Sequence, residues 1–188
     1  MILLITGVLL WTLVHLSPAI APSFRAGLIE RVGAKPYRGL FAAMIGLALV
    51  LIVLGWRSTT EEYLYVLPAW SRQVGILLMF LSFVLIGAAN SQSIVKRYIR
   101  HPMLTGIFVW ALSHLLTNGT TRALVLFGIL GAWSLIEMPL INARDGARSL
   151  PQAPGFSAEL KLLFISTIVF FVAIFLHPYF AGVSPLSK

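Results

Sequence analysis

Residues 40–56 read LFAAMIGLALVLIVLGW and contain no charged side chain. A helix needs about 20 mostly apolar residues, with a range of about 17–25, to cross a bilayer core about 30 Å thick. This stretch therefore predicts a transmembrane helix, with Arg38 and Arg57 just beyond its two ends. The same criterion can be applied along the whole chain.

The chain of 188 residues has a membrane composition, because 59% of its residues are hydrophobic and only 11% are charged. Soluble domains have about 45–50% apolar and about 25% charged residues. Apolar runs, free of charged residues except for Glu137 in the fifth, predict six spans, at residues 2–20, 40–56, 74–89, 103–117, 123–140 and 162–180. The sequence thus predicts an all-α fold, a polytopic membrane helix bundle of about six transmembrane helices in a single domain over residues 1–188.

The charged residues predict the orientation of this bundle. Lys and Arg outnumber Asp and Glu by 14 to 6, and in a membrane protein such an excess points to an anionic lipid bilayer, not to nucleic acid. Ten of the basic residues follow the first span or precede the fourth and sixth, which leaves Arg57, Arg72, Arg122 and Lys188 on the other face. The ten-residue face is predicted to be cytoplasmic, so that both termini lie on the outer, periplasmic side.

The chain has no cysteine. Disulfides, thiolate metal sites, a cysteine nucleophile and covalent attachment of a c-type haem are therefore excluded. A metal or cofactor would have to be held by histidine, by carboxylates or by non-covalent contacts.

Two phrases of the sequence share their most distinctive residues. Residues 7–16 read GVLLWTLVHL and residues 106–115 read GIFVWALSHL, with five of ten positions identical. A helical period of 3.6 predicts that the glycine, tryptophan and histidine of each phrase share one helix face, namely Gly7, Trp11 and His15 in the first span and Gly106, Trp110 and His114 in the fourth.

Two interpretations of these histidines are open. Each can hydrogen-bond a nearby hydroxyl or carbonyl group and help the helices to pack. Two histidines in matched intramembrane positions favour a functional role, because neutral imidazole is a common metal ligand and two axial histidines can hold a haem. Glycine and tryptophan beside them suit a flat ligand.

The predicted topology places the two histidines at different depths. The first and fourth spans run in opposite directions, so His15 and His114 lie one turn beyond their tryptophans toward opposite faces. With both tryptophans near the middle of the membrane, the Cα atoms of the histidines differ in depth by about 12 Å. A haem held by both would have to be tilted, or the predicted span ends would have to shift by a few residues.

A second motif, RHPMLTG, begins at Arg100 and His101. Arg100 can extend toward the cytoplasmic headgroups, and Pro102 suits the first turn of the fourth span. The motif also resembles the Arg-His-Pro signature of integral-membrane methyltransferases, which implies an S-adenosylmethionine site at Arg100, His101 and Glu137. Glu137 has the alternative role of a helix-end partner for Arg100 or Arg144, and His177 is expected to have an interfacial role.

A closer resemblance covers all but the last span. The stretches HLSPAIAPSFRAGLIERVGAKPYRGLFA, from His15, and RHPMLTGIFVWALSHLLTNG, from Arg100, resemble the NnrU family of bacterial inner-membrane proteins. That family is associated with nitrite and nitric oxide reduction in denitrification. It is related to the plastid 15-cis-zeta-carotene isomerase, which carries a b-type haem with two axial histidines.

The resemblance implies haem b bound through His15 and His114, near Trp11, Trp110, Gly7 and Gly106. The implied protein is a redox-gated, isomerase-like enzyme on a lipophilic small molecule, or a gas or redox sensor. The chain departs from the isomerase in the Leu-Ser-Pro after His15 and in a shorter C-terminal loop, which puts a carotenoid substrate in doubt. The alternatives are a methyltransferase and a non-catalytic assembly factor for a membrane reductase.

Overall fold

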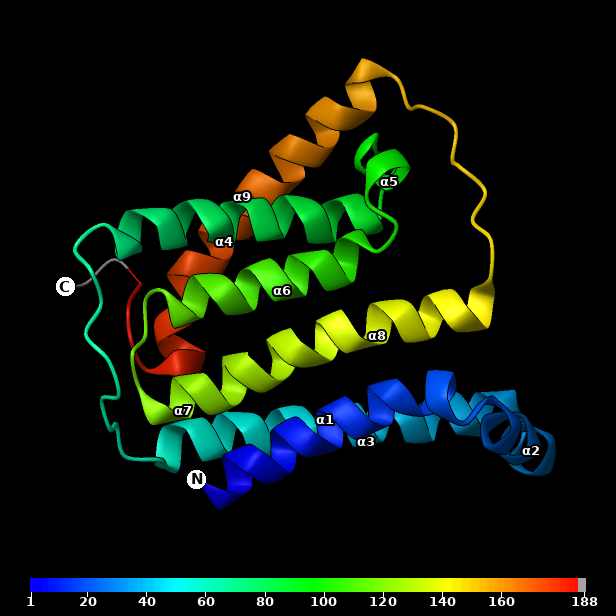
Figure 1. Ribbon diagram of the computed structural model, residues 1–188, viewed down its shortest axis with the longest axis horizontal. Coiled ribbons are helices and arrows are strands. Elements are labelled where there is room, and N and C mark those ends of the chain that lie inside the picture. Colours follow the sequence, from blue (N-terminus) through cyan, green and yellow to red (C-terminus); the bar gives the residue numbers. More distant parts are fainter. Residues whose placement is uncertain (186–188) are drawn as a thin grey trace.

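The computed structural model describes residues 1–185, and its regular elements are all helical (Figure 1). One of them, η1, is a π-helical turn. In chain order the elements are α1 (Ile2–Ile20), α2 (Pro22–Val32), α3 (Ala34–Ser58), α4 (Ser71–Ala89), α5 (Val95–Tyr98), α6 (Pro102–Leu115), α7 (Thr121–Ala123), η1 (Leu124–Gly128), α8 (Ile129–Asp145) and α9 (Phe156–Ala181).

Five helical segments are long and apolar enough to cross a membrane, namely α1, α3, α4, α9 and the continuous segment from α7 through η1 to α8. The predicted polytopic helical bundle is therefore confirmed. The predicted fourth span is the shorter helix α6, which has 14 residues and is about 21 Å long. The chain is a multi-pass membrane protein, in which α6 is the short apolar helix beside the five longer ones.

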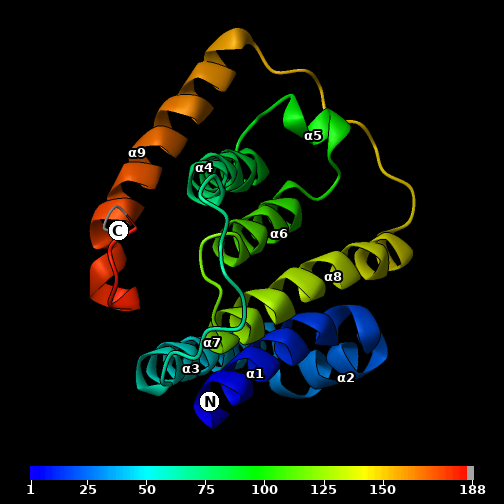
Figure 2. The ribbon, with the colours of Figure 1, turned by 60° about the vertical axis from the view of Figure 1, so that its left-hand side comes forward.

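The helices form two closely packed pairs joined by α8. Helix α1 packs along α3, and α4 packs along α6. Helix α8 contacts both α1 and α6 and lies between them (Figures 1 and 2). Helix α9 crosses the bundle obliquely and contacts α4 and α3. The two repeated phrases thus belong to different helix pairs.

The predicted grouping of basic segments is visible in the fold. Helix α2, helix α5 and the connection between α8 and α9 all lie at one end of the bundle (Figure 1). Most of the ten basic residues predicted to be cytoplasmic belong to these segments or to the helix ends beside them. The opposite end holds Arg57 and Arg122, whereas Lys188 lies outside the described residues.

Proline sets two of the sharpest breaks in the chain. Ala21, before Pro22, has φ −126° and ψ 60°, and His101, before Pro102, has φ −121° and ψ 65°. Proline disfavours the helical conformation in the residue before it but suits the first turn of a helix. Helices α2 and α6 therefore both begin at a proline, and Pro102 opens α6 as predicted.

The two helix pairs are held together by different means. In the α1–α3 pair, Gly7 and Gly55 let the backbones meet, because a Cβ atom on Gly7 would lie 2.7 Å from the Ile52 nitrogen and one on Gly55 would collide with the Leu4 backbone. In the α4–α6 pair, Ser82 Oγ donates a hydrogen bond to Gly106 O (2.7 Å) and Ser113 Oγ donates one to Gly75 O (2.7 Å). Small and hydroxyl-bearing residues are the usual means of joining helices in lipid.

The end of the bundle opposite α2 is closed by Arg122. Its guanidinium donates hydrogen bonds to Trp56 O (3.1 Å) and Thr59 O (3.2 Å) and forms an ion pair with Glu61. It also lies 4.3 Å from the centroid of the Trp56 ring. These contacts tie the start of α7 to the end of α3 and satisfy a charge that is largely buried.

Candidate functional site: two histidine clusters

The two repeated histidines have the same local geometry. His15 Nδ1 lies 2.9 Å from Trp11 O, and His114 Nδ1 lies 2.9 Å from Trp110 O. Because a carbonyl oxygen can only accept, Nδ1 carries the proton in both rings, and Nε2 keeps a free lone pair. This is the arrangement by which a second hydrogen bond orients a metal-ligating histidine. It also satisfies the packing interpretation, so the geometry of these bonds is compatible with both roles.

His15 lies in an aromatic cluster between α1, α3 and α8. Its ring stacks on Trp11 with centroids 4.3 Å apart and contacts Trp133 at 5.0 Å and Phe41 at 5.8 Å. We call these four residues the His15 cluster. Trp133 is only 3% exposed, so the centre of the cluster is buried against α8.

Several buried polar atoms in or next to the His15 cluster are unpaired. Among the described residues, Trp11 Nε1, Trp133 Nε1 and Glu137 Oε2 have no hydrogen-bond partner. Glu137 is 8% exposed and lies one helical turn from Trp133 on α8, where its carboxylate faces the Trp133 indole N–H as an acceptor. Buried polar atoms are normally paired, because each unpaired one costs about 1–3 kcal/mol. Because Glu137 can accept from Trp133, the buried donor of the cluster that has no partner among the described residues is Trp11 Nε1.

His114 lies in a second cluster, formed by α6, η1 and α9. Its ring stacks on Phe127 at 4.1 Å and contacts Trp110 at 4.8 Å, and the His177 ring lies 6.4 Å away at an interplanar angle of 21°. We call these four residues the His114 cluster. His177 Nδ1 donates to Val183 O (2.6 Å), which leaves its Nε2 free as well.

The position of His177 was not anticipated from the sequence, which assigned it an interfacial role. Its placement beside His114 depends on the oblique path of α9, and no local pattern around His177 specifies that path. The only sequence signal is the presence of a histidine near the outer end of a span at the same predicted depth as His114.

Helix α8 and η1 separate the two clusters. His15 contacts Trp133 and His114 contacts Phe127, and these two residues are six positions apart, or about 9 Å along the helix axis. A ligand bound by both histidines would have to enter where the Trp133 and Phe127 side chains now lie.

The glycines of the repeated phrases contact other helices. Gly7 meets the α3 backbone at Ile52, and a Cβ atom on Gly106 would lie 3.1 Å from Ser82 O on α4. In each repeated phrase, therefore, the helix face predicted to carry Gly, Trp and His together contacts more than one neighbouring helical element. The glycines serve close helix packing, and the aromatic and imidazole rings face α8, η1 and α9.

The donor set fits a haem better than a metal ion held by the protein alone. No group of three or more His, Cys, Asp or Glu residues able to hold a metal ion occurs within residues 1–185. A haem supplies four of its own nitrogen ligands and requires only one or two axial side chains. His15 and His114 each have Nδ1 bound to a carbonyl oxygen and no hydrogen bond at Nε2, so either ring can serve as one axial ligand, whereas a haem held by both would require the side chains of Trp133 and Phe127 to move.

Arg100 and His101 are bonded to the end of α8. Arg100 Nη2 donates to Gly146 O (2.7 Å), and His101 Nε2 lies 2.8 Å from Asn142 Oδ1. No hydrogen bond or ion pair joins either residue to Glu137 in the described part of the chain, and Arg144, the other expected partner of Glu137, is paired with Asp145. The RHP motif thus closes the α2 end of the bundle by joining α6 to α8.

Comparison with known proteins gives one match. No curated protein matches the chain, and no solved structure does. The sequence model of the family described as NnrU protein matches residues 3–185, which is nearly the whole chain. The resemblance carried by the His15 and Arg100 motifs is therefore confirmed, and the chain belongs to the NnrU family.

Proposed function

We propose that this NnrU-family protein is a haem b protein of the bacterial inner membrane, with His15 and His114 as axial ligands. The observation that carries the proposal is the matched geometry of the two rings, each of which has Nδ1–H bound to a carbonyl and Nε2 free. The buried Trp11 Nε1, which has no hydrogen-bond partner among the described residues, adds support, because a bound polar group beside His15 could accept a hydrogen bond from it.

The chain's own residues would orient the ligands and exclude water. The carbonyls of Trp11 and Trp110 hold the imidazole rings in one tautomer, and Trp133 and Phe127 cover them. Bound haem would supply a one-electron centre whose axial coordination can change with oxidation state. Such a centre suits a redox-gated, isomerase-like enzyme on a lipophilic substrate, or a redox or gas sensor in nitrite and nitric oxide metabolism.

Absorption spectroscopy tests this proposal directly. The protein is purified in mild detergent from haem-replete cells, and oxidised and reduced spectra are recorded with a pyridine haemochrome assay for haem b. We expect a Soret band that is lost or strongly shifted in His15→Ala and in His114→Ala. His101→Ala is the matched control, because His101 is bonded to Asn142 outside both clusters, and it should keep the band.

The variant His177→Ala distinguishes two ligand sets. Loss of the band in His114→Ala and His177→Ala, with retention in His15→Ala, would show that the two histidines 6.4 Å apart are the ligands and that the pairing of the repeated phrases is wrong. A colourless protein that unfolds cooperatively would overturn the haem proposal as a whole.

Two alternatives have their own tests. A methyltransferase requires S-adenosylmethionine binding, measured by calorimetry and abolished by Arg100→Ala, but the side chains of Arg100 and His101 are already bonded to Gly146, just after α8, and to Asn142 on α8. An assembly factor requires a membrane reductase subunit that co-purifies with the protein.

A further inference from the structure

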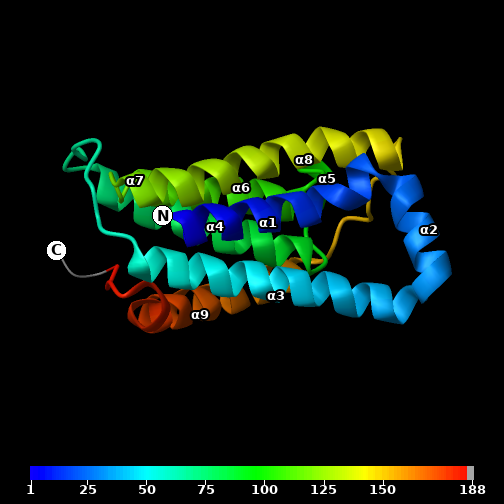
Figure 3. The ribbon, with the colours of Figure 1, turned by 90° about the horizontal axis from the view of Figure 1, so that it is seen from below.

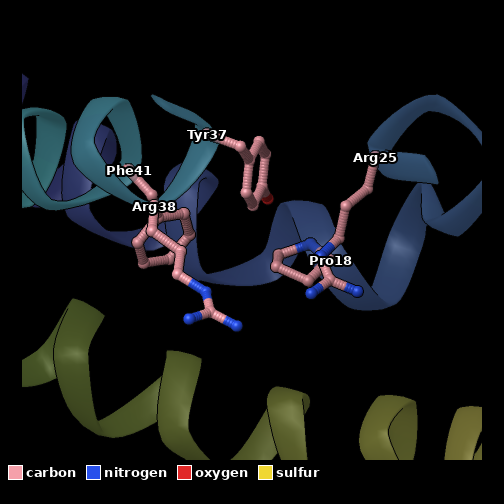
Figure 4. Close-up of a pocket in the computed structure, with 5 residues that line it drawn as sticks. All are labelled: Pro18, Arg25, Tyr37, Arg38 and Phe41. Carbon is pink, nitrogen blue, oxygen red and sulfur yellow. The ribbon is translucent and has the colours of Figure 1, made fainter. Parts of the chain in front are cut away.

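A pocket of about 290 Å³ opens where α1, α2 and α3 meet, at the end of the bundle that carries most of the basic residues. It is lined by Pro18 from α1, Arg25 from α2, and Tyr37, Arg38 and Phe41 from α3 (Figure 4). One part of its lining is apolar and aromatic, and another part is cationic. It is separate from the RHP motif.

Neither arginine of the pocket has an acidic partner. Within residues 1–185 the ion pairs are Arg122 with Glu61 and Arg144 with Asp145, and neither Arg25 nor Arg38 takes part in one. The Arg25 guanidinium lies 5.7 Å from the centre of the Tyr37 ring, which helps to hold it. Figure 4 shows Arg25 and Arg38 on different walls, with the tips of both side chains toward the α8 side of the opening.

Helix α2 places this pocket at the depth of the lipid headgroups. It runs across the end of the bundle, roughly perpendicular to α1 and α3 (Figure 3). None of its residues is buried in the protein, and the Phe24 side chain is 72% exposed. A helix at the end of membrane spans, with exposed apolar and basic side chains, lies in the membrane interface.

We propose that Arg25 and Arg38 form a binding site for a phosphate group carried by an anionic lipid. Guanidinium groups bind phosphate oxygens through paired hydrogen bonds, and basic pockets between membrane helices on the cytoplasmic side bind anionic headgroups. Pro18, Tyr37 and Phe41 would contact the glycerol and the start of the acyl chains. A free phosphate ion has the same charge chemistry but would not use this apolar wall.

The site lies beside the His15 cluster because Phe41 belongs to both. Its ring lines the pocket and lies 5.8 Å from the His15 ring. A lipid or lipid-like acid held by the arginines would therefore have its apolar part next to α1 and α3 near His15. The proposal does not depend on haem, since the pocket is complete without it.

The competing explanation is a general attraction between a basic face and an anionic leaflet. Arg31 and Lys35 offer a matched control, because they lie in the same α2–α3 region and carry the same total charge but do not line the pocket. The double variants Arg25→Ala/Arg38→Ala and Arg31→Ala/Lys35→Ala therefore lose equal charge at different places.

Native mass spectrometry of the delipidated full chain in neutral detergent measures the difference. We expect the wild-type protein to bind one phosphatidylglycerol with clear preference over phosphatidylcholine. Arg25→Ala/Arg38→Ala should weaken this binding about tenfold or more, and Arg31→Ala/Lys35→Ala should weaken it about twofold at most. Arg25→Lys/Arg38→Lys keeps the charge and should give an intermediate loss.

A competition arm with inorganic phosphate identifies the source of the phosphate group. No displacement of phosphatidylglycerol by millimolar phosphate supports a lipid site, and displacement supports a phosphate site that free anions can also fill. Equal losses in the two alanine double variants, or no preference between the two lipids, would overturn the proposal. Thermal unfolding of each variant checks that binding is compared between folded proteins.

Discussion

The His15 and His114 clusters contain similar sequence motifs but have different surroundings in the fold. In both, histidine Nδ1 donates to the carbonyl four residues earlier, and the ring contacts the tryptophan of its own phrase. The neighbours then differ, because His15 meets Trp133 near unpaired polar atoms, whereas His114 meets Phe127 and His177. The repeated motif determines the hydrogen bond and the tryptophan contact of each histidine, whereas the helices packed against the motif determine its other neighbours.

The largest expected effect comes from replacing Trp133, the α8 side chain that covers His15. Trp133→Ala should lower the free energy of unfolding by about 3 kcal/mol, because truncation of a buried aromatic side chain leaves a cavity. Trp133→Phe removes the indole N–H, which faces Glu137, and makes this position resemble Phe127, so it should cost less than about 1.5 kcal/mol. Denaturation in mixed detergent micelles measures both values.

The two Trp133 variants also test the comparison of the clusters. If Trp133→Phe is as destabilising as Trp133→Ala, the indole N–H makes a stabilising hydrogen bond, for which Glu137 is the acceptor that the chain offers. Phe127→Ala is the matched control on the His114 side. Phe127 is 4% exposed and has no polar atom in its side chain, so the loss of unfolding free energy in this variant measures the removal of a buried aromatic ring alone.

A smaller effect is expected at the glycines of the two phrases. Gly7→Ala should destabilise by about 2 kcal/mol, because its Cβ atom would meet backbone atoms of Ile52 and Ala48 that cannot easily move. Gly106→Ala should cost somewhat less, because the backbone atoms nearest its Cβ position, Ser82 O at 3.1 Å and Ile86 N at 3.2 Å, lie farther away than Ile52 N does from the Cβ position of Gly7. Thermal unfolding in one detergent ranks the two variants, and the reverse order would contradict the packing described for α1 and α3.

The smallest effect is expected from the serine that fastens α6 to α4. Ser113→Ala removes the hydrogen bond to Gly75 O, and such bonds within membranes are worth about 0.6 kcal/mol on average. Ser17→Ala is the control, because Ser17 Oγ bonds Val14 O within its own helix α1. A loss at Ser113 no larger than that at Ser17 would show that this hydroxyl does not join the two helices.

Much of the fold could be predicted from composition and charge. Charge-free runs located the apolar helices, and the structure extends most of them, for example from residues 40–56 to Ala34–Ser58. The extension arises because arginine and lysine at helix ends can direct their charged groups toward the interface while the backbone stays helical. Helix α2 was not predicted, because it is not a membrane-spanning helix and none of its side chains is buried in the protein.

The candidate site was predicted only in part. Spacing alone identified His15 and His114 with their tryptophans, because the helical period relates residues four positions apart. It could not show that Gly7 packs on α3 while Trp11 faces α8, since two helices can contact different sides of one stripe of residues. It also could not bring His177 to His114, which are far apart in the chain.

The sequence by itself determined the membrane character, the number and approximate positions of the apolar helices, the grouping of basic residues at one end, and the imidazole–tryptophan pairs. These properties depend on residues close together in the chain or on the chemistry of the bilayer. Only the tertiary structure decided that α8 lies between the two histidines, that polar atoms near His15 are left unpaired, and that Arg25 and Arg38 share a pocket. Those features arise where distant helices meet, and helix packing depends on the shapes of both surfaces at once.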